Sequence, residues 1–159
     1  MSGKGTPATV AATRAQVGFR LHPYAASGDG GASYGYEAAD ALGVRHDRVF
    51  KTLVAEVDGH LTVGVVPVDA SLDLKALAAA VGGKKAAMAD PRAAERATGY
   101  VRGGISPLGQ RKRLPTVIDA SVGGHTSVFV SAGRRGLQIE LSPADLLHLT
   151  GATTADLRG

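Results

Sequence analysis

The sequence predicts an α/β protein of the α+β type: a mixed, largely antiparallel sheet curled into a partly open barrel, with helices on the outside. Two observations lead to this fold class. Helix-like and strand-like segments are interspersed along the chain. One pair of strand-like segments is separated only by Asp58-Gly59, which is typical of a two-residue hairpin turn and excludes a purely parallel sheet.

The first half of the chain predicts two helices and three strands. Thr6 and Pro7 are favoured at the N-cap and first position of a helix, and Gly18 ends it. Alternation over 19–24 predicts a strand, at a sheet edge because Pro23 has no N–H to pair. Then come a glycine-rich loop over 27–33, a helix over 34–42 ended by Gly43, a strand over 49–57 and its returning strand over 61–68.

The second half predicts three helices and three further strands. Ser71 is the expected N-cap of a helix that ends at Gly82-Gly83, and Asp90-Pro91 begins a short helix that Gly99 ends. Strands are expected over 114–118, 126–130 and 137–141, before a last helix that begins at Ser142 and ends at Gly151.

No repeat or dividing linker is visible, so we expect residues 1–159 to form a single domain, with residues 1–5 disordered. A chain of 159 residues can bury roughly two thirds of its unfolded surface. The polar segment Met1–Thr6 is followed by no apolar stretch of membrane-spanning length. We therefore expect a cytoplasmic protein with no membrane partner.

Composition excludes several kinds of site. The chain has no cysteine, which excludes disulfides, thiolate zinc sites and a cysteine nucleophile. Its five histidines lack metal-ligand spacing, and no Walker loop or nucleophile elbow is present. We expect no metal or cofactor, so an enzyme built from this chain would act by positioning and polarisation.

The net charge of +4 is a mild basic excess. Basic residues cluster beside glycine-bearing turns at 84–85, 111–113 and 134–135. Such clusters are either a solvated face or a contact surface for a polyanion.

The most unusual segment runs from Thr98 to Thr116 and contains four glycines and two prolines, which disfavour regular helix and strand. Gly103-Gly104 would let backbone N–H groups approach a ligand closely, and the basic triplet Arg111–Arg113 follows. Backbone N–H groups that are free to donate, next to positively charged side chains, are typical of a site for an anionic or ester-bearing ligand. The alternative is a charged surface turn.

A second unusual feature is Lys51, which interrupts the apolar strand over 49–57. A lysine in such a strand either extends its amine to solvent or points into a polar cavity. In a cavity, desolvation would lower its pKa unless a ligand or carboxylate pairs with it.

Four segments together resemble the YbaK family of Cys-tRNA(Pro) deacylases, which is related to the editing domain inserted in bacterial prolyl-tRNA synthetases. They are Phe-Lys-Thr-Leu at 50–53, Met-Ala-Asp-Pro at 88–91, Thr-Gly-Tyr-x-x-Gly-Gly-Ile-Ser-Pro-Leu-Gly at 98–109 and Ser-x-Gly-x-Arg-Gly-Leu at 131–137. The resemblance extends from about Pro7 to Leu157, with the motifs in order.

The resemblance implies an enzyme that removes cysteine from mischarged Cys-tRNA(Pro), and from Cys-tRNA(Cys), with the substrate's own thiol attacking the ester. It implies aminoacyl-tRNA as partner, prolyl-tRNA synthetase as a possible second one, and no DNA. Lys51, Gly103 and Gly104 are then the candidate catalytic residues. The candidate substrate-binding residues are Tyr24, Tyr34, Thr52, Ser106, Ser131 and Gln138; the candidate tRNA-binding residues are Lys84, Lys85, Arg111, Lys112 and Arg113.

Two positions depart from the family pattern. Tyr34 stands where relatives often have Phe, and Gln138 where many have Asp. These departures keep two alternatives open: an editing hydrolase for Ala-tRNA(Pro), and a tRNA- or synthetase-binding module without turnover.

Overall fold

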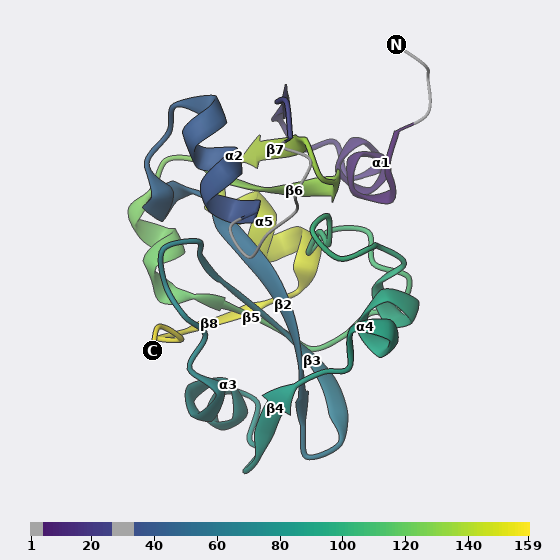
Figure 1. Cartoon of the computed structure of the whole chain (residues 1–159), viewed down its shortest axis with the longest axis vertical. Helices are drawn as coiled ribbons and strands as arrows, with labels where there is room; N and C mark the ends of the chain where they lie inside the picture. The colour runs from purple at the N-terminus through teal and green to yellow at the C-terminus, as the bar shows by residue number, and fades with distance from the viewer. Residues whose placement is uncertain (1–4, 27–33) are drawn as a thin grey trace.

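Two β-sheets, linked through β2, form the framework of the protein (Figure 1). The computed structural model describes residues 5–26 and 34–159, so the predicted loop over 27–33 and the first four residues of the predicted disordered terminus lie outside it. The smaller sheet has the order β1-β7-β6 and the larger one β4-β2-β3-β5-β8. Their strands are β1 Phe19–Pro23, β2 Phe50–Val57, β3 His60–Pro67, β4 Ala86–Met88, β5 Thr116–Asp119, β6 Val128–Arg134, β7 Leu137–Leu141 and β8 Thr153–Ala155.

The barrel part of the predicted fold is not supported. The strands separate into these two sheets, and neither is closed on itself within the described residues. The mixed character is confirmed, because β3–β5 and β5–β8 pair in parallel whereas the other strand pairs are antiparallel. The predicted hairpin is also confirmed, with Val57 paired with His60 across the turn.

A gap along one edge of β2 separates its two neighbours on that side. β4 pairs with β2 only over Ala55–Val57. At the other end Val49, just before β2, forms a parallel bridge with Phe129 of β6. Between these contacts, residues 50–53 have no strand on that edge in the described part of the chain. The gap therefore lies where the two sheets meet.

Local sequence determines most helix ends. The helices are α1 Pro7–Arg14, α2 Tyr34–Leu42, η1 His46–Arg48, α3 Leu74–Ala80, α4 Pro91–Thr98, η2 Ala120–Gly124 and α5 Pro143–Thr150. Thr6, Asp90 and Ser142 cap α1, α4 and α5 as predicted, each side chain accepting a first-turn N–H. The N-cap of α3 is Asp73 rather than Ser71, because its carboxylate receives the Ala76 N–H.

The main core lies between the two sheets. Phe50, Val65 and Ile118 from the larger sheet pack with Val130 and Ile139 from the smaller one, all of them buried. Leu146 of α5 and the alanines of α1 complete this cluster. A second cluster joins the other face of the larger sheet to α3 through Leu77. No described helix has both the length and the apolar character needed to cross a membrane.

Candidate active site

A cavity of about 500 Å³ occupies the gap beside β2. Its walls come from β2 itself, from Met88 of β4, from Ser131 of β6 and Gln138 of β7, from α4 and from the loop that contains Gly103. This volume is typical of small-molecule sites. Thus the meeting point of the two sheets is where a ligand can enter.

Lys51 lines the cavity and is half-buried. Of the two possibilities that its sequence position left open, the structure selects the cavity rather than the solvent-exposed end. Burial lowers the pKa of the ammonium below its usual value, and the Asp69 carboxylate partly offsets this effect. A cation that is only partly compensated in this way favours an anionic or strongly polar ligand.

The glycine loop reaches the same cavity through Arg102, Gly103 and Ile105, but not through Gly104. Gly103 has a φ of +89° and lies against the Tyr34 ring, so a Cβ there would be 3.0 Å from Tyr34 Cζ. No acceptor for the Gly103 N–H occurs in the described residues. The Gly104 N–H, in contrast, donates to the Val101 carbonyl at 2.9 Å. The expectation of two bare amides is therefore wrong for Gly104.

Ser131 holds this loop against the smaller sheet. Its hydroxyl donates to the Gly104 carbonyl at 3.0 Å and accepts the Gly133 N–H at 3.1 Å. Gly104 is pressed onto β6 so closely that a Cβ would lie 2.7 Å from Arg134 Cα. These contacts fix the position of the neighbouring Gly103 beside the cavity.

Two buried oxygen atoms in the cavity wall have no hydrogen-bond partner among the described residues: Thr52 Oγ1 and Gln138 Oε1. Buried polar atoms are usually hydrogen-bonded, so both oxygens lack a donor that the described residues do not supply. Tyr24 and Tyr34, also predicted as substrate-binding residues, line the same cavity. Tyr34 stacks beneath the Arg135 guanidinium, which pairs with Glu37 at 2.9 Å.

Other predicted site residues lie elsewhere. Ser106 is fully buried outside the cavity lining, and its Oγ accepts the Leu108 N–H at 3.1 Å. The backbone N–H groups of Lys84 and Lys85 donate to the Asp58 carboxylate at the hairpin tip. Lys112 and Arg113 line a separate, smaller cavity of about 210 Å³.

Sequence reasoning missed the contribution of α4. Pro91, Ala94 and Glu95 of this helix line the cavity, together with Arg102 just beyond it. The helix itself was predicted, but no local pattern shows which side of it faces a cavity. In the described residues no three His, Cys, Asp or Glu side chains gather closely enough to hold a metal ion.

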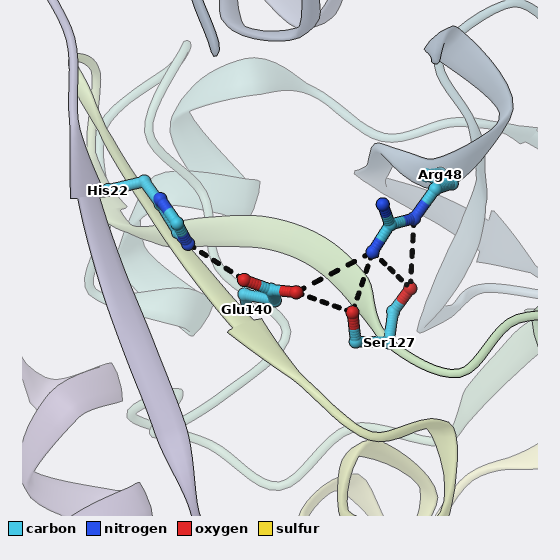
Figure 2. Close-up of polar contacts among 4 residues, drawn as sticks. All are labelled: His22, Arg48, Ser127 and Glu140. Carbon is cyan, nitrogen blue, oxygen red and sulfur yellow. Dashed lines mark hydrogen bonds and ion pairs between the residues drawn. The ribbon is translucent and has the colours of Figure 1, made fainter. Parts of the chain in front are cut away.

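A polar network supports the cavity wall from the side (Figure 2). Glu140 of β7 accepts from His22 of β1 at 2.8 Å, accepts from the Ser127 hydroxyl and pairs with Arg48 at 3.5 Å. Arg48 precedes β2, and Glu140 lies two residues from Gln138 on the same face of β7. The network therefore ties the strand that carries Lys51 to the strand that carries Gln138.

Replacing Glu140 with glutamine is expected to cost about 1–2 kcal/mol of unfolding free energy at neutral pH. The Ser127 hydrogen bond, followed by His22 and Arg48, lowers the pKa of Glu140. Because the folded pKa is depressed, this stabilisation is present above the unfolded pKa and is lost as pH falls through the folded value. Urea unfolding at neutral and increasingly acidic pH should show the difference shrink.

The matched control is Glu56→Gln, because Glu56 is exposed on β2. Its effect should be within about 0.5 kcal/mol of zero at neutral pH. An equal loss in both variants would contradict the assigned role of the network.

Comparison with known proteins matches the family model "Aminoacyl-tRNA editing domain" to residues 32–149. The chain belongs to this family. Among curated proteins, this editing domain is 43% identical over 122 residues, 75% of its length and 73% of the relative's, to the "Putative Cys-tRNA(Pro)/Cys-tRNA(Cys) deacylase EbsC" of Enterococcus faecalis. The family resemblance drawn from the four sequence segments is thereby confirmed.

Solved structures give the same result for the fold. One, described as "Crystal structure of a putative trans-editing enzyme for prolyl tRNA synthetase", superposes on this editing domain with a TM-score of 0.79 and 29% identity, covering 89% of this chain and 87% of that one. A hypothetical protein gives a TM-score of 0.85 and 25% identity, with 96% and 99% covered. The editing-domain fold therefore extends over nearly the whole chain.

Proposed function

We propose that the protein is a cytoplasmic trans-editing deacylase, formed by one domain, that removes cysteine from Cys-tRNA(Pro) and from Cys-tRNA(Cys). The observation that carries the proposal is a single cavity lined both by the half-buried Lys51 and by Gly103, whose N–H has no acceptor in the described residues. The 43% identity to a relative named for this activity supports the choice of substrate. Prolyl-tRNA synthetase is a candidate partner, because one structural neighbour is described as a trans-editing enzyme for that synthetase.

The substrate's thiol is the proposed nucleophile. No Ser, Thr or Tyr hydroxyl in the cavity lining is hydrogen-bonded to a histidine in the described residues, so none is activated by the usual base. A cysteine thiol held against its own carbonyl gains a high effective molarity. The sulfur forms a bond to the carbonyl carbon, the ester C–O bond breaks, and the thiol proton passes to the departing ribose oxygen. Cysteine leaves as a cyclic thiolactone.

The protein contributes charge and orientation. The Gly103 N–H would donate to the carbonyl oxygen as negative charge develops there, an interaction typically worth about 3 kcal/mol. Lys51 would orient the ester or the terminal phosphate. The unpartnered oxygens of Thr52 and Gln138 would accept hydrogen bonds from the substrate's ammonium group.

The test is release of amino acid from tRNA(Pro) charged in parallel with cysteine, alanine, serine and S-methylcysteine. We expect release of cysteine, with the S-methylcysteine ester cleaved at least 100-fold more slowly, because capping the sulfur removes the nucleophile. Equal cleavage of the S-methylcysteine ester would overturn the thiol mechanism. Release of alanine alone would indicate an Ala-tRNA(Pro) hydrolase, and tRNA binding without release would indicate a non-catalytic module.

A further inference from the structure

Helix α4 has two chemically different sides. Pro91, Ala94 and Glu95 line the cavity. Arg92 and Arg96 are exposed, and because they are four residues apart they lie on one stripe of the helix. Figure 1 shows α4 at the outer margin of the molecule. A single helix thus forms part of the cavity wall and presents two arginines to solvent.

The basic triplet extends this stripe beyond the end of α4. The Arg111 and Lys112 N–H groups donate to the carbonyls of Thr98 and Ala97, both at 2.9 Å, so the triplet is fixed to the last turn. Arg111 also packs over Gly99, with its Nε 3.7 Å from where a Cβ would lie. At about 1.5 Å per residue, Arg92 to Gly99 spans about 10 Å of helix axis. We call Arg92, Arg96, Arg111 and Lys112 the α4 basic row.

The carboxylates of Asp90, at the N-cap of α4, and of Glu95, within α4, each accept a backbone hydrogen bond. Asp90 caps α4 by accepting the Ala93 N–H at 3.0 Å. Glu95 accepts the Arg102 N–H at 2.9 Å on the cavity side. None of the four side chains of the α4 basic row has an ion-pair partner in the described residues. The row is therefore an exposed strip of positive charge on and beside α4, the helix whose Pro91, Ala94 and Glu95 line the cavity.

We propose that the α4 basic row binds backbone phosphates of the substrate RNA beyond its terminal nucleotide, while the inner side of α4 forms the wall against that nucleotide. This inference rests on the proposed function. Charge complementarity favours a nucleic acid, because phosphate contacts by exposed Arg and Lys supply most sequence-independent affinity. Lys84 and Lys85 lie away from this row: their backbone N–H groups donate to Asp58, which follows β2 and is seven residues from Lys51, about 23 Å at about 3.3 Å per residue.

The experiment compares Arg92→Ala/Arg96→Ala with Lys84→Ala/Lys85→Ala. Both double variants remove two exposed positive charges, so net charge is matched. Affinity for uncharged tRNA(Pro) is measured by filter binding over a range of salt concentrations. The arginine double variant is expected to bind tRNA about tenfold or more weakly. The slope of log association constant against log salt concentration should fall in magnitude by about 1.4–1.8. The lysine double variant should keep the wild-type affinity and the wild-type slope.

A second measurement uses substrates of different length. The arginine pair should raise KM for full-length Cys-tRNA(Pro) without changing kcat, and should leave KM unchanged for a cysteinylated CCA trinucleotide. Unchanged tRNA affinity would overturn the proposal and would indicate that the α4 basic row instead binds an acidic protein surface. An equal KM effect on the trinucleotide, or an equal loss in the lysine pair, would also overturn it. Failure of the wild type to deacylate any substrate would refute the proposed function, whereas the binding result tests the row by itself.

Discussion

Replacing Lys51 with methionine is expected to lower kcat/KM for Cys-tRNA(Pro) by about 10²–10³, the usual loss when one electrostatic contact to the reacting group is removed. Methionine keeps an apolar stem of similar length in the cavity wall. The measurement is single-turnover release of cysteine, with Lys75→Met as the matched control because Lys75 is exposed on α3.

The same variant separates activity from stability. Because burial depresses the pKa of Lys51, the unfolded chain binds the proton more tightly, and the charged side chain opposes folding. This cost is fully present below the folded pKa and disappears as pH rises past the unfolded value of about 10.4. Lys51→Met should therefore melt no lower than wild type at neutral pH. A loss of activity that is proportional to a loss of folded protein would refute the catalytic assignment.

Gly104→Ala is expected to lower the unfolding free energy by about 1–3 kcal/mol and kcat/KM by about 100-fold. A Cβ on Gly104 would lie 2.7 Å from Arg134 Cα and 3.0 Å from Arg135 N, and these backbone atoms cannot rotate away. The loop must shift, which breaks the Ser131 hydrogen bond to the Gly104 carbonyl and displaces Gly103 from the cavity rim. Urea unfolding and single-turnover kinetics measure the two effects.

Gly123→Ala is the matched control, since its Cβ would meet no atom within 4 Å. It should unfold and react like the wild type. If both alanine variants behaved alike, close packing against β6 could not be what fixes the Gly103 loop.

Local chemistry explains which parts of the fold were predictable. The caps at Thr6, Asp90 and Ser142, and the turn at Asp58-Gly59, each depend on a few adjacent residues, so the sequence predicts them directly. The strands β4 and β8 are only three residues long and carry no alternation of their own. They form because β4 can pair with the free edge of β2 and β8 with that of β5. The division into two sheets, rather than one curled sheet, depends on such long-range pairing.

The site was predictable to a similar extent. A lysine in an apolar strand and a glycine pair in a loop are local signals, and family resemblance added Tyr24, Thr52 and Gln138, all of which line the cavity. Ser106 lies in the same motif but points into the core, because its Oγ serves the loop's own backbone at Leu108. The bond that occupies the Gly104 N–H, and the place of α4 in the wall, are tertiary contacts that spacing does not encode.

The gap along β2 also has a consequence for solubility. An unpaired strand edge is a template on which a second molecule can add its own strand, the usual start of edge-to-edge aggregation. Here the unpaired stretch at residues 50–53 is recessed between β4, which pairs from Ala55 onward, and β6, which meets Val49. Because β4 and β6 lie on either side of it, the unpaired edge at residues 50–53 is too short for a strand of a second molecule to pair with it. The protein can thus keep an open edge for its ligand without offering it to another copy of itself.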